Sequence, residues 1–508
     1  MSTRSSSGQT SVPSADSPRP RRRRRWIWAL AAIPLLAASA IGASWWRARI
    51  ASEHVRSLAV LPFFDSTRGD GLDWFGEGLT CEIIDDLSRV PALRVAARTS
   101  AFTFAEAPRD LLAIGRQLGV AAVLEGNIRV SEGRLRATLD LHRTEDGYQL
   151  WTADVERPID DVFGLEQAVV LALEHRIGAA PPRTAGLREP QAKAYDAYLE
   201  GRAQLSLTDA ASMQRAAERF VKATELDPRF ALAWAWQSVA LEYQADTAGV
   251  RPNEAMAAAR DAAERAVALD NDSAAAHLAL GMVKLQYDWD WRGAKDEFDH
   301  ALQLNPGSAY TQHWLAHWYE TQGKLADAMH VMAGALALDP LSPEMLRDIV
   351  AEHLASSDPA GALPFAKQAA ELQPHMRHAQ AELALALGAA GHVDEGRRLC
   401  STLQAAPDGE QPPSVESAMC AALGDPAKVD EARALLDQGE DLHSDLHVPS
   451  VALARLAAAL GDQDSAFQWL ERAWDERSVQ LPYARLDPRM AKTDPRFLDL
   501  LDRMNLPR

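Results

Sequence analysis

The chain has 508 residues, of which 47% are hydrophobic and 24% are charged, so a fully disordered chain and a protein with many membrane spans are both excluded. At about 150 residues per domain, the length predicts about three structural units. The net charge of −18 excludes nucleic acid as an expected partner of the folded part. The cysteines Cys81, Cys400 and Cys420 are too few for a disulfide scaffold or a cysteine-based zinc framework.

The N-terminal region predicts a membrane anchor. Residues 1–25 are rich in Ser, Pro and Arg and predict a disordered basic tail, and residues 26–46 carry no charge and have tryptophans at both ends. A helix over 26–46 would be about 31 Å long, which matches a hydrocarbon core of about 30 Å. The arginines predict that this tail stays in the cytoplasm and that residues 50–508 lie on the other side. A signal peptide cleaved at Ala38–Ala40 is the alternative, but the apolar stretch continues to Trp46.

The segment 55–178 predicts a small α/β domain with a mixed sheet covered by helices. Alternating or continuous apolar runs predict strands at 57–62, 93–97, 120–130, 134–141 and 148–155. Helical spacing predicts helices at 74–89, 111–118 and 160–177.

Several stretches of this segment resemble one known domain. They are SLAVLPF (57–63), FGEGLTCEIIDDLSRVPALRVAARTSAF (75–102), LGVAAVLEGNIR (118–129) and YQLWTADVERPIDDVFGLEQ (148–167). They resemble the TolB amino-terminal-like, or FlgO-like, domain of bacterial membrane-anchored proteins that also carry tetratricopeptide repeats. Related chains place a DNA-binding, kinase or cyclase domain before the membrane helix. Here only 25 residues precede the apolar segment, so the sequence predicts no such activity in the chain itself.

The segment 190–478 predicts about six to eight tetratricopeptide repeats. Leu304-Asn-Pro306, Leu338-Asp-Pro340 and Leu372-Gln-Pro374 recur every 34 residues, which is the period of this two-helix repeat. The expected packing positions of two successive units are Leu315, Ala316, Tyr319, Ala328, Met332 and Ala335, and then Ile349, Ala362, Ala366 and Ala369. Such an array forms a superhelix with a concave surface. We expect residues 479–508 to cap it.

The repeats also resemble those of the sensor portions of CadC-like and adenylate-cyclase-associated proteins, through Tyr287–Trp291, His313-Trp314 and Arg485–Pro488. The resemblance implies protein–protein interaction. The expected architecture is a single membrane helix at 26–46, an α/β domain at 55–178 and an all-α repeat superhelix at 190–478.

The sequence predicts no catalytic, cofactor-binding or metal-ligating residue, since it contains no phosphate-binding, nucleophile-elbow or zinc-protease motif. His313 and His317 have a spacing that can bind zinc, but no third ligand can be named, so we favour a solvent-facing or groove-lining pair. Asp288, Asp290, Gly293 and Asp299 match a calcium-loop template in which Arg292 occupies a ligand position. A packing and capping role is the favoured interpretation of those four.

Two further groups of residues leave alternatives open. Cys400 and Cys420 lie in neighbouring helical units, and we favour unpaired core cysteines over a disulfide; Cys81 is expected to be a small packing residue. A cluster of tryptophans could line a peptide groove, but core packing between repeats is the favoured interpretation. Its members are Trp234, Trp236, Trp289, Trp291, Trp314 and Trp318.

These observations lead to one main functional hypothesis. It is a non-enzymatic, single-pass protein of the bacterial inner membrane that presents a repeat groove for a protein or peptide in the periplasm, without a cofactor. The alternative is a sensor or regulatory component whose effector lies on another chain. An enzyme hidden in the α/β domain is the third possibility, and the sequence offers no constellation for it. The partner and the oligomeric state stay open.

Overall fold

In the computed structural model the described residues are 55–65, 73–105, 109–178, 188–205, 210–247, 252–404, 420, 423, 426–446 and 448–508. The predicted basic tail and the predicted membrane helix at 26–46 lie outside them. Among the helices within the described ranges, none combines the length and apolarity that crossing a bilayer requires. Residues Val55–Arg508 form one compact unit, in which an α/β part is followed by a helical part.

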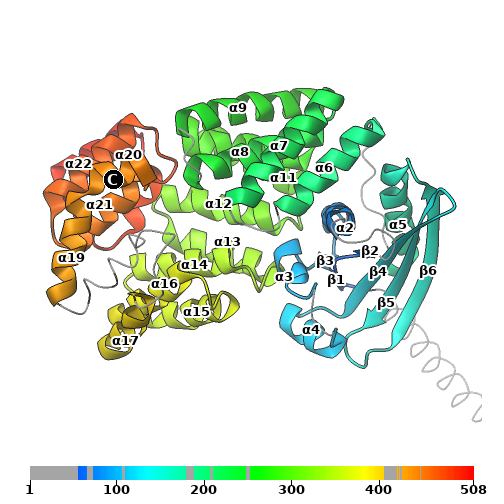
Figure 1. Cartoon of the computed structure of the whole chain (residues 1–508), viewed down its shortest axis with the longest axis horizontal. Coiled ribbons are helices and arrows are strands. Elements are labelled where there is room, and N and C mark those ends of the chain that lie inside the picture. The colour runs from blue at the N-terminus through cyan, green and yellow to red at the C-terminus, as the bar shows by residue number, and fades with distance from the viewer. Residues whose placement is uncertain are drawn as a thin grey trace, which may run out of the picture. The chain divides into compact units, whose positions relative to one another are not determined.

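The first part of this unit is a mixed sheet (Figure 1). Its strands are β1 (Ser57–Val60), β2 (Phe64–Asp65), β3 (Arg94–Val95), β4 (Ala122–Ser131), β5 (Arg134–Arg143) and β6 (Gln149–Pro158). They run in the order β3-β1-β4-β5-β6, and β2 extends the pairing of β1 with β4. β1 pairs in parallel with both β3 and β4, and β4-β5-β6 is an antiparallel meander. The predicted mixed sheet is therefore confirmed.

Alternation along β1 explains why the sheet has two cores. Leu58 and Val60 face one side, where α2 (Asp73–Ser88) and α5 (Val162–Ile177) pack, while Ala59 and Leu61 face α4 (Leu111–Leu118). The short helix α3 (Arg98–Phe102), which the sequence pattern did not predict, follows β3. The predicted strand at 93–97 is reduced to two residues because the chain turns into this helix.

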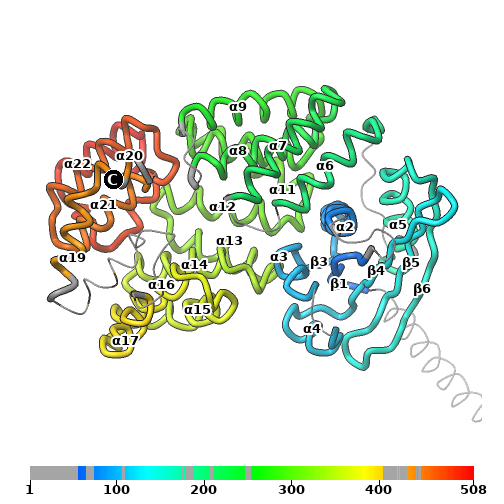
Figure 2. Tube along the Cα trace, in the orientation of Figure 1, coloured from blue at the N-terminus to red at the C-terminus, as the bar shows by residue number. Residues whose placement is uncertain are grey.

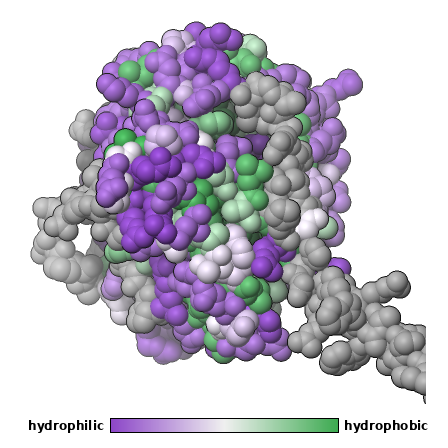
Figure 3. Space-filling view, turned by 90° about the vertical axis from the view of Figure 1, so that its right-hand side faces the viewer, coloured by the Kyte–Doolittle hydropathy of each residue, from purple (hydrophilic) through white to green (hydrophobic). Residues whose placement is uncertain are grey.

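On strands β5 and β6, the sheet face opposite α2 and α5 carries polar side chains. Arg136 and Thr138 on β5 both bind the carboxylate of Asp154 on β6, at 2.5 and 2.7 Å. Figure 3 shows the side of the molecule on which the sheet lies in Figure 1. This side is mostly hydrophilic, with hydrophobic residues between the hydrophilic ones. Tyr148 and Phe64 are the most exposed large hydrophobic side chains of the described residues, at 64% and 58%.

The rest of the unit is helical, and its elements follow one another in pairs (Figure 2). The helices are α6 (Ala192–Gln204), α7 (Ala210–Leu226), α8 (Ala231–Thr247), α9 (Pro252–Leu269), α10 (Ala274–Val283), α11 (Trp291–Leu304), α12 (Ala309–Thr321), α13 (Leu325–Leu338), α14 (Pro343–Ala355), α15 (Pro359–Leu372), α16 (Arg377–Ala389), α17 (Val393–Gln404), α19 (Pro426–Asp437), α20 (Gly439–Leu446), α21 (Ser450–Ala459), α22 (Gln463–Asp475) and α23 (Pro495–Arg503), with the π-helix η1 (Lys284–Asp288) and the 3-10 helix η2 (Leu481–Leu486). Each even-numbered helix from α6 to α16 packs on the helix that follows it, and α21 packs on α22 in the same way. The helical part thus has the predicted tetratricopeptide character.

The repeat signature explains where these helices end and how they pack. α11, α13 and α15 end at Leu304, Leu338 and Leu372, two residues before the proline of each motif, because a proline disfavours helical geometry in the residue before it. The predicted packing positions are buried, with Tyr319 only partly so. Small side chains such as Ala316, Ala328 and Ala362 are fully enclosed, which lets paired helices approach closely.

A buried charge network, which we call the Arg202 network, joins the sheet region to the first helical pair. Arg202 on α6 is 1% exposed and donates to Glu82 Oε1 at 2.6 Å and to Asp85 Oδ2 at 2.8 Å, both on α2. Tyr198 donates to the same Glu82 oxygen at 3.0 Å, and the guanidinium carbon of Arg202 lies 3.9 Å from the ring centre of Trp236. Because guanidinium and carboxylates satisfy one another, the charges can be buried together.

The polar residue of the repeat motif makes two more contacts to the sheet region. Asn305 exchanges hydrogen bonds with Ser88 at the end of α2, at 2.8 and 3.0 Å. One period later, Asp339 accepts hydrogen bonds from the backbone N–H and the hydroxyl of Ser100 on α3, at 2.8 and 2.5 Å. Successive repeats therefore dock on successive elements of the α/β part.

The C-terminal segment packs back on the middle of the helical array. η2 lies against α12 and α14. Trp291 Nε1 donates to the carbonyl of Met504 at 2.8 Å, and Arg485 donates to the carbonyl of Thr321 at 2.8 Å. Trp289 stacks on Trp474 with ring centres 4.9 Å apart. Residues 474–506 thus cover helices that precede them by more than 120 positions.

Candidate functional site

Two helices of neighbouring repeats place histidines opposite carboxylates. The Ser308 side chain caps α12 through the backbone N–H of Thr311, and Ser342 caps α14, which begins with Pro343. On α12, His313, His317 and Glu320 follow one another at helical spacing, and on α14 Glu344, Asp348 and Glu352 are each four residues apart. We call His313, His317, Glu320, Asp348 and Glu352 the histidine–carboxylate cluster.

The cluster is held by short polar contacts. His313 Nε2 lies 2.7 Å from Asp348 Oδ2, and His317 Nε2 lies 3.6 Å from the same oxygen. The other ring nitrogen of His317, Nδ1, donates to Glu320 Oε2 at 2.7 Å. One ligand atom each from His313, His317 and Asp348 can be chosen so that all three lie within 4.8 Å of one another.

Most of the cluster is buried, and some of its polar atoms have no hydrogen-bond partner. His313, Glu320 and Glu352 are at most 1% exposed, whereas the side chain of Asp348 is 20% exposed. His313 Nδ1, Glu320 Oε1 and both carboxyl oxygens of Glu352 make no hydrogen bond within the described part of the chain. Buried polar atoms without partners are costly and rare, so this concentration at one place calls for a ligand or a proton.

Burial and neighbouring charges shift the acid–base behaviour of the cluster. Burial opposes the charged form of His317, but Glu320 and Asp348 outweigh it and raise the pKa of His317 to about 10. Burial likewise opposes ionisation of Asp348, yet the two histidines lower the pKa of Asp348 to about 2. The pKa of Glu352 rises to about 9, first through burial and then through Glu320 and Asp348. The positive charge between Glu320 and Asp348 is therefore that of the protonated His317 ring itself.

The structure corrects the interpretation of the histidine pair. The sequence favoured a solvent-facing or groove-lining pair without a third ligand, but His313 is buried, the side chain of His317 is only 14% exposed, and Asp348 completes a set of three. Sequence reasoning missed Asp348 because it lies 35 residues after His313, on another repeat. The four-residue spacing of the acids along α14 is the signal that could have drawn attention to it.

The C-terminal segment covers part of this cluster as well as Trp289 and Trp291. The ring of Tyr483 on η2 lies edge-on to the His317 ring, with centres 5.4 Å apart. Trp236, Trp289, Trp291 and Trp314 are between 7% and 9% exposed, so core packing is confirmed for them over an open peptide groove. Trp234 and Trp318 are partly buried. Trp318 donates to the carbonyl of Trp291 at 2.6 Å.

The calcium template does not converge into a site in the structure. Asp288 pairs with Arg260 on α9, and Asp299 pairs with Lys295 at 2.6 Å. Asp290 caps α11 by accepting from the backbone N–H of Gly293 at 2.9 Å. The predicted capping role is thus confirmed for Asp290, and the other two acids serve ion pairs.

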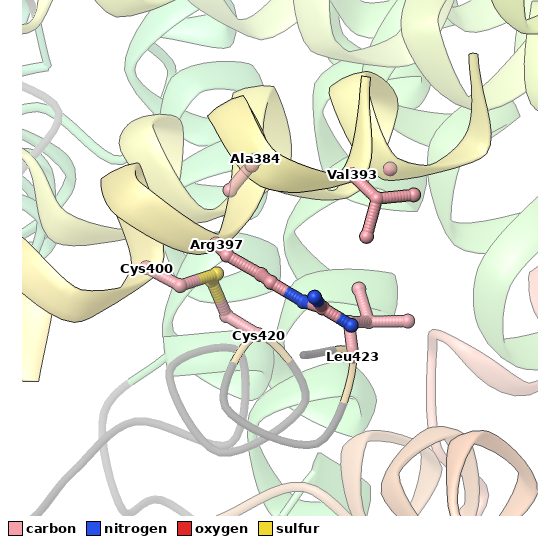
Figure 4. A pocket seen from close by; sticks show the side chains of 8 residues that line it. Ala384, Val393, Arg397, Cys400, Cys420 and Leu423 are labelled. Atoms are coloured by element: carbon pink, nitrogen blue, oxygen red, sulfur yellow. A yellow bond between two sulfur atoms is a disulfide. The ribbon is translucent and has the colours of Figure 1, made fainter. Parts of the chain in front are cut away.

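The cysteines differ from the sequence-based expectation. Cys400 and Cys420 form a disulfide, with their Cα atoms 5.6 Å apart, whereas the sequence favoured unpaired thiols. The bridge lines a small hollow with Ala384, Val393 and Leu423, next to the side chain of Arg397 (Figure 4). Cys81 on α2 is fully buried, as expected for a small packing residue, and burial raises the pKa of its thiol.

Comparisons with known proteins give limited similarities. No family model matches the sequence. A protein of Rhizobium meliloti (strain 1021) named "Putative adenylate cyclase 3" is 28% identical over 254 residues, which are 48% of this chain and 42% of that protein. The chain thus spans less than half the length of this curated relative.

Solved structures resemble the chain over part of its length. Human IFIT1, as a monomeric mutant with Gppp-AAAA, is 14% identical with a TM-score of 0.41, over 62% of this chain and 77% of IFIT1. The type IV pilus biogenesis factor PilW is 15% identical with a TM-score of 0.34, over 42% of this chain and 93% of PilW. YrrB, a TPR protein with an unusual peptide-binding site, is 17% identical with a TM-score of 0.25, over 37% of this chain and 91% of YrrB.

Proposed function

We propose that this chain is a membrane-anchored scaffold whose helical repeats bind a protein or peptide in the bacterial periplasm. The observation that carries the proposal is the uninterrupted stacking of paired helices from α10 to α17, in which every helix also packs on the next one along the chain. Such arrays present an extended concave surface that can bind other chains. Residues 26–46 supply the anchor.

The disulfide supports the part of this proposal that places residues 50–508 outside the cytoplasm. Structural disulfides persist in oxidising compartments such as the periplasm and are rare in the cytosol. The Cys400–Cys420 bridge closes a segment of 20 positions between α17 and the helices that follow. An oxidising environment for residues 50–508 is also what the basic run before residue 26 predicts.

We place the partner surface away from Trp289 and Trp291, because the C-terminal segment covers these two side chains. Met376, at the start of α16, is 51% exposed, and Leu269 at the end of α9 is 38% exposed. Both lie at helix ends of the repeat array, where an extended peptide can reach apolar side chains without displacing residues 474–506.

Site-specific crosslinking in intact cells tests the scaffold function. A photoreactive amino acid would replace Met376 or Leu269 in the full chain, and the matched control would carry it at Tyr148, which is exposed on the sheet. We expect a discrete envelope protein to be captured from the helical positions and absent from the Tyr148 control. Equal capture at all three positions, or none in a chain shown to be folded, would contradict the proposal.

A separate experiment tests the anchor and its orientation. A phosphatase that is active only in the periplasm would be fused after Arg508. We expect an active fusion in the membrane fraction, and thiol labelling of cells should find Cys400 and Cys420 oxidised. An inactive fusion with labelled thiols would place residues 50–508 in the cytoplasm and overturn this part of the proposal.

The similarity to a protein named as an adenylate cyclase favours a second candidate function. The chain would be the sensor part of a signalling system whose effector is another protein, contacted through residues 1–25. Deletion of residues 1–20 discriminates the two candidates. A signalling phenotype would be lost on deletion, whereas periplasmic capture of a partner would persist.

A further inference from the structure

The histidine–carboxylate cluster has the composition and geometry of a metal site. We propose that His313, His317 and Asp348 bind one divalent transition-metal ion of the zinc class between α12 and α14. This assignment is independent of the scaffold function. It also departs from the expectation of no metal ligand, which rested on the sequence alone.

The ligand atoms are close enough to share one ion. Zinc takes histidine nitrogens and carboxylate oxygens at about 2.0–2.2 Å, so ligand atoms around it are separated by about 3.3 Å. The separation from Asp348 Oδ2 is 2.7 Å for His313 Nε2 and 3.6 Å for His317 Nε2. Both separations differ from this value by about 0.6 Å or less.

The surroundings supply to His317 what a metal-ligating histidine requires. Such a histidine donates its second ring N–H to a carboxylate or carbonyl, which fixes its tautomer and orientation. His317 does this through Nδ1, which donates to Glu320 Oε2 at 2.7 Å. Its Nε2 is thereby directed toward Asp348. Glu320 acts in this arrangement as a positioning residue.

The charge and burial of the cluster favour a cation over an empty, packed core. Glu320 and Glu352 are each at most 1% exposed, and they leave three carboxyl oxygens without a hydrogen bond within the described part of the chain. A divalent ion would neutralise the charges of Asp348 and Glu320, the two acids that contact His317. Asp348, with a side chain that is 20% exposed, gives the ion a path from solvent.

The nitrogen-rich ligand set selects the class of metal. Imidazole suits zinc, copper, iron and nickel, whereas calcium and magnesium prefer sets made of oxygen alone. Two histidines and one carboxylate leave at least one coordination position for water or another ligand. The site thus differs in kind from the calcium template at 288–299, whose acids are taken by a cap and ion pairs.

Metal titration of the full chain tests the proposal. The chain, purified in detergent without a polyhistidine tag and stripped with a chelator, would be titrated with Co²⁺ as a spectroscopic probe and with Zn²⁺ by calorimetry. We expect one equivalent of each, with visible Co²⁺ absorption that Zn²⁺ abolishes and Ca²⁺ does not. The absence of a stoichiometric site in the folded wild-type chain would overturn the proposal.

Three variants and a control separate ligation from packing. H317Q and D348N should each weaken Zn²⁺ binding at least about 100-fold, and E320Q by about 10- to 100-fold with the Co²⁺ spectrum retained. The control is H277Q, because His277 is also a buried histidine that contacts a carboxylate, Glu297 Oε2 at 2.6 Å, and lies beside His300, but Lys284 binds the other oxygen of that carboxylate at 2.6 Å. H277Q should bind Zn²⁺ as the wild type does.

The melting temperatures of the metal-free variants show whether each of them folds. D348N preserves the shape of the side chain, so it keeps the test valid even where H317Q fails to fold. If D348N is folded and binds Zn²⁺ as tightly as H277Q, then Asp348 is not a ligand and the cluster is a buried ion pair only.

Discussion

The chain buries two charged clusters at helix junctions, and they differ in the cation that balances the acids. The Arg202 network, between α2 and α6, uses a guanidinium that is always charged and donates to both Glu82 and Asp85. The histidine–carboxylate cluster, between α12 and α14, uses two imidazoles facing Asp348. An arginine fixes a junction permanently, whereas imidazoles can exchange a proton for a metal ion.

The largest expected effect on stability comes from removing the guanidinium of Arg202. R202M should lower the free energy of unfolding by about 3–5 kcal/mol, because it leaves buried Glu82 with the hydrogen bond from Tyr198 but without a cation. The measurement is urea unfolding of the full chain in detergent. R219M is the matched control, since Arg219 pairs with Glu200 at 2.9 Å but its side chain is 48% exposed, and its loss should cost at most about 1 kcal/mol. Similar costs for both variants would remove the contrast between a buried and an exposed pair.

A smaller effect on stability is expected for the histidine–carboxylate cluster. D348N should lower the stability of the metal-free chain by about 1–3 kcal/mol, because the hydrogen bond from His313 loses its charged acceptor. The cost stays below that of R202M because an imidazole can release its proton.

Zn²⁺ at about 100 times its Kd should stabilise the wild type by about 2.7 kcal/mol and leave the stability of D348N unchanged. D299N, at the exposed Lys295–Asp299 pair, is the control. A D348N cost equal to that of R202M would contradict this ranking.

Stability should also depend on pH through the acids beside the Arg202 network. Burial first, and then Asp86 and Glu82, raises the pKa of Glu166 well above its usual value, and Tyr195 donates to its carboxyl group. The folded chain then binds a proton that the unfolded chain has lost above about pH 4.3. Stability therefore falls as the pH rises from there, by up to about 1.4 kcal/mol per pH unit.

E166Q should flatten this pH dependence, because an amide does not titrate and still accepts from Tyr195. Unfolding measured at intervals between pH 5 and pH 8 gives the slope for each chain. E189Q, beyond the sheet region, provides a control in which the slope should equal that of the wild type. An unchanged slope in E166Q would show that Glu166 is already ionised in the folded chain.

The smallest expected effect concerns a docking contact built on hydrogen bonds. The Ser100 hydroxyl donates to Asp339 at 2.5 Å and accepts from the backbone N–H of Leu341 at 2.8 Å. S100A should therefore lower stability by about 1–2 kcal/mol. T103A removes an exposed hydroxyl on the same segment and should change stability by less than about 0.5 kcal/mol. Equal thermal unfolding of the two variants would show that this contact adds nothing to the docking of α13 on the sheet region.

Local sequence patterns predicted most helices and strands well, because buried residues recur along a single helix or strand at the period of that element. The 34-residue recurrence of Leu304, Leu338 and Leu372 located the ends of α11, α13 and α15. Alternation located β4, β5 and β6 to within a few residues. The two-residue strand β2 and the short helix α3 escaped prediction, because pairing partners and packing decide such short elements.

The candidate site was only half visible in the sequence. His313 and His317 share one helix face, which spacing reveals. Asp348 and Tyr483 reach the same place from another repeat and from the C-terminal segment, and no local period connects those positions. The same reason explains the wrong expectation for Cys400 and Cys420.

The sequence by itself determined the paired helices, the mixed sheet and the core positions, because each follows from where apolar side chains recur along one helix or strand. Only the tertiary structure decided how polar residues are used. Asn305 and Asp339, alike in the repeat motif, meet Ser88 and Ser100 across more than 200 positions of chain. Such partners are brought together by the packing of whole elements, and a buried polar atom must then find its hydrogen bond wherever the fold has placed one.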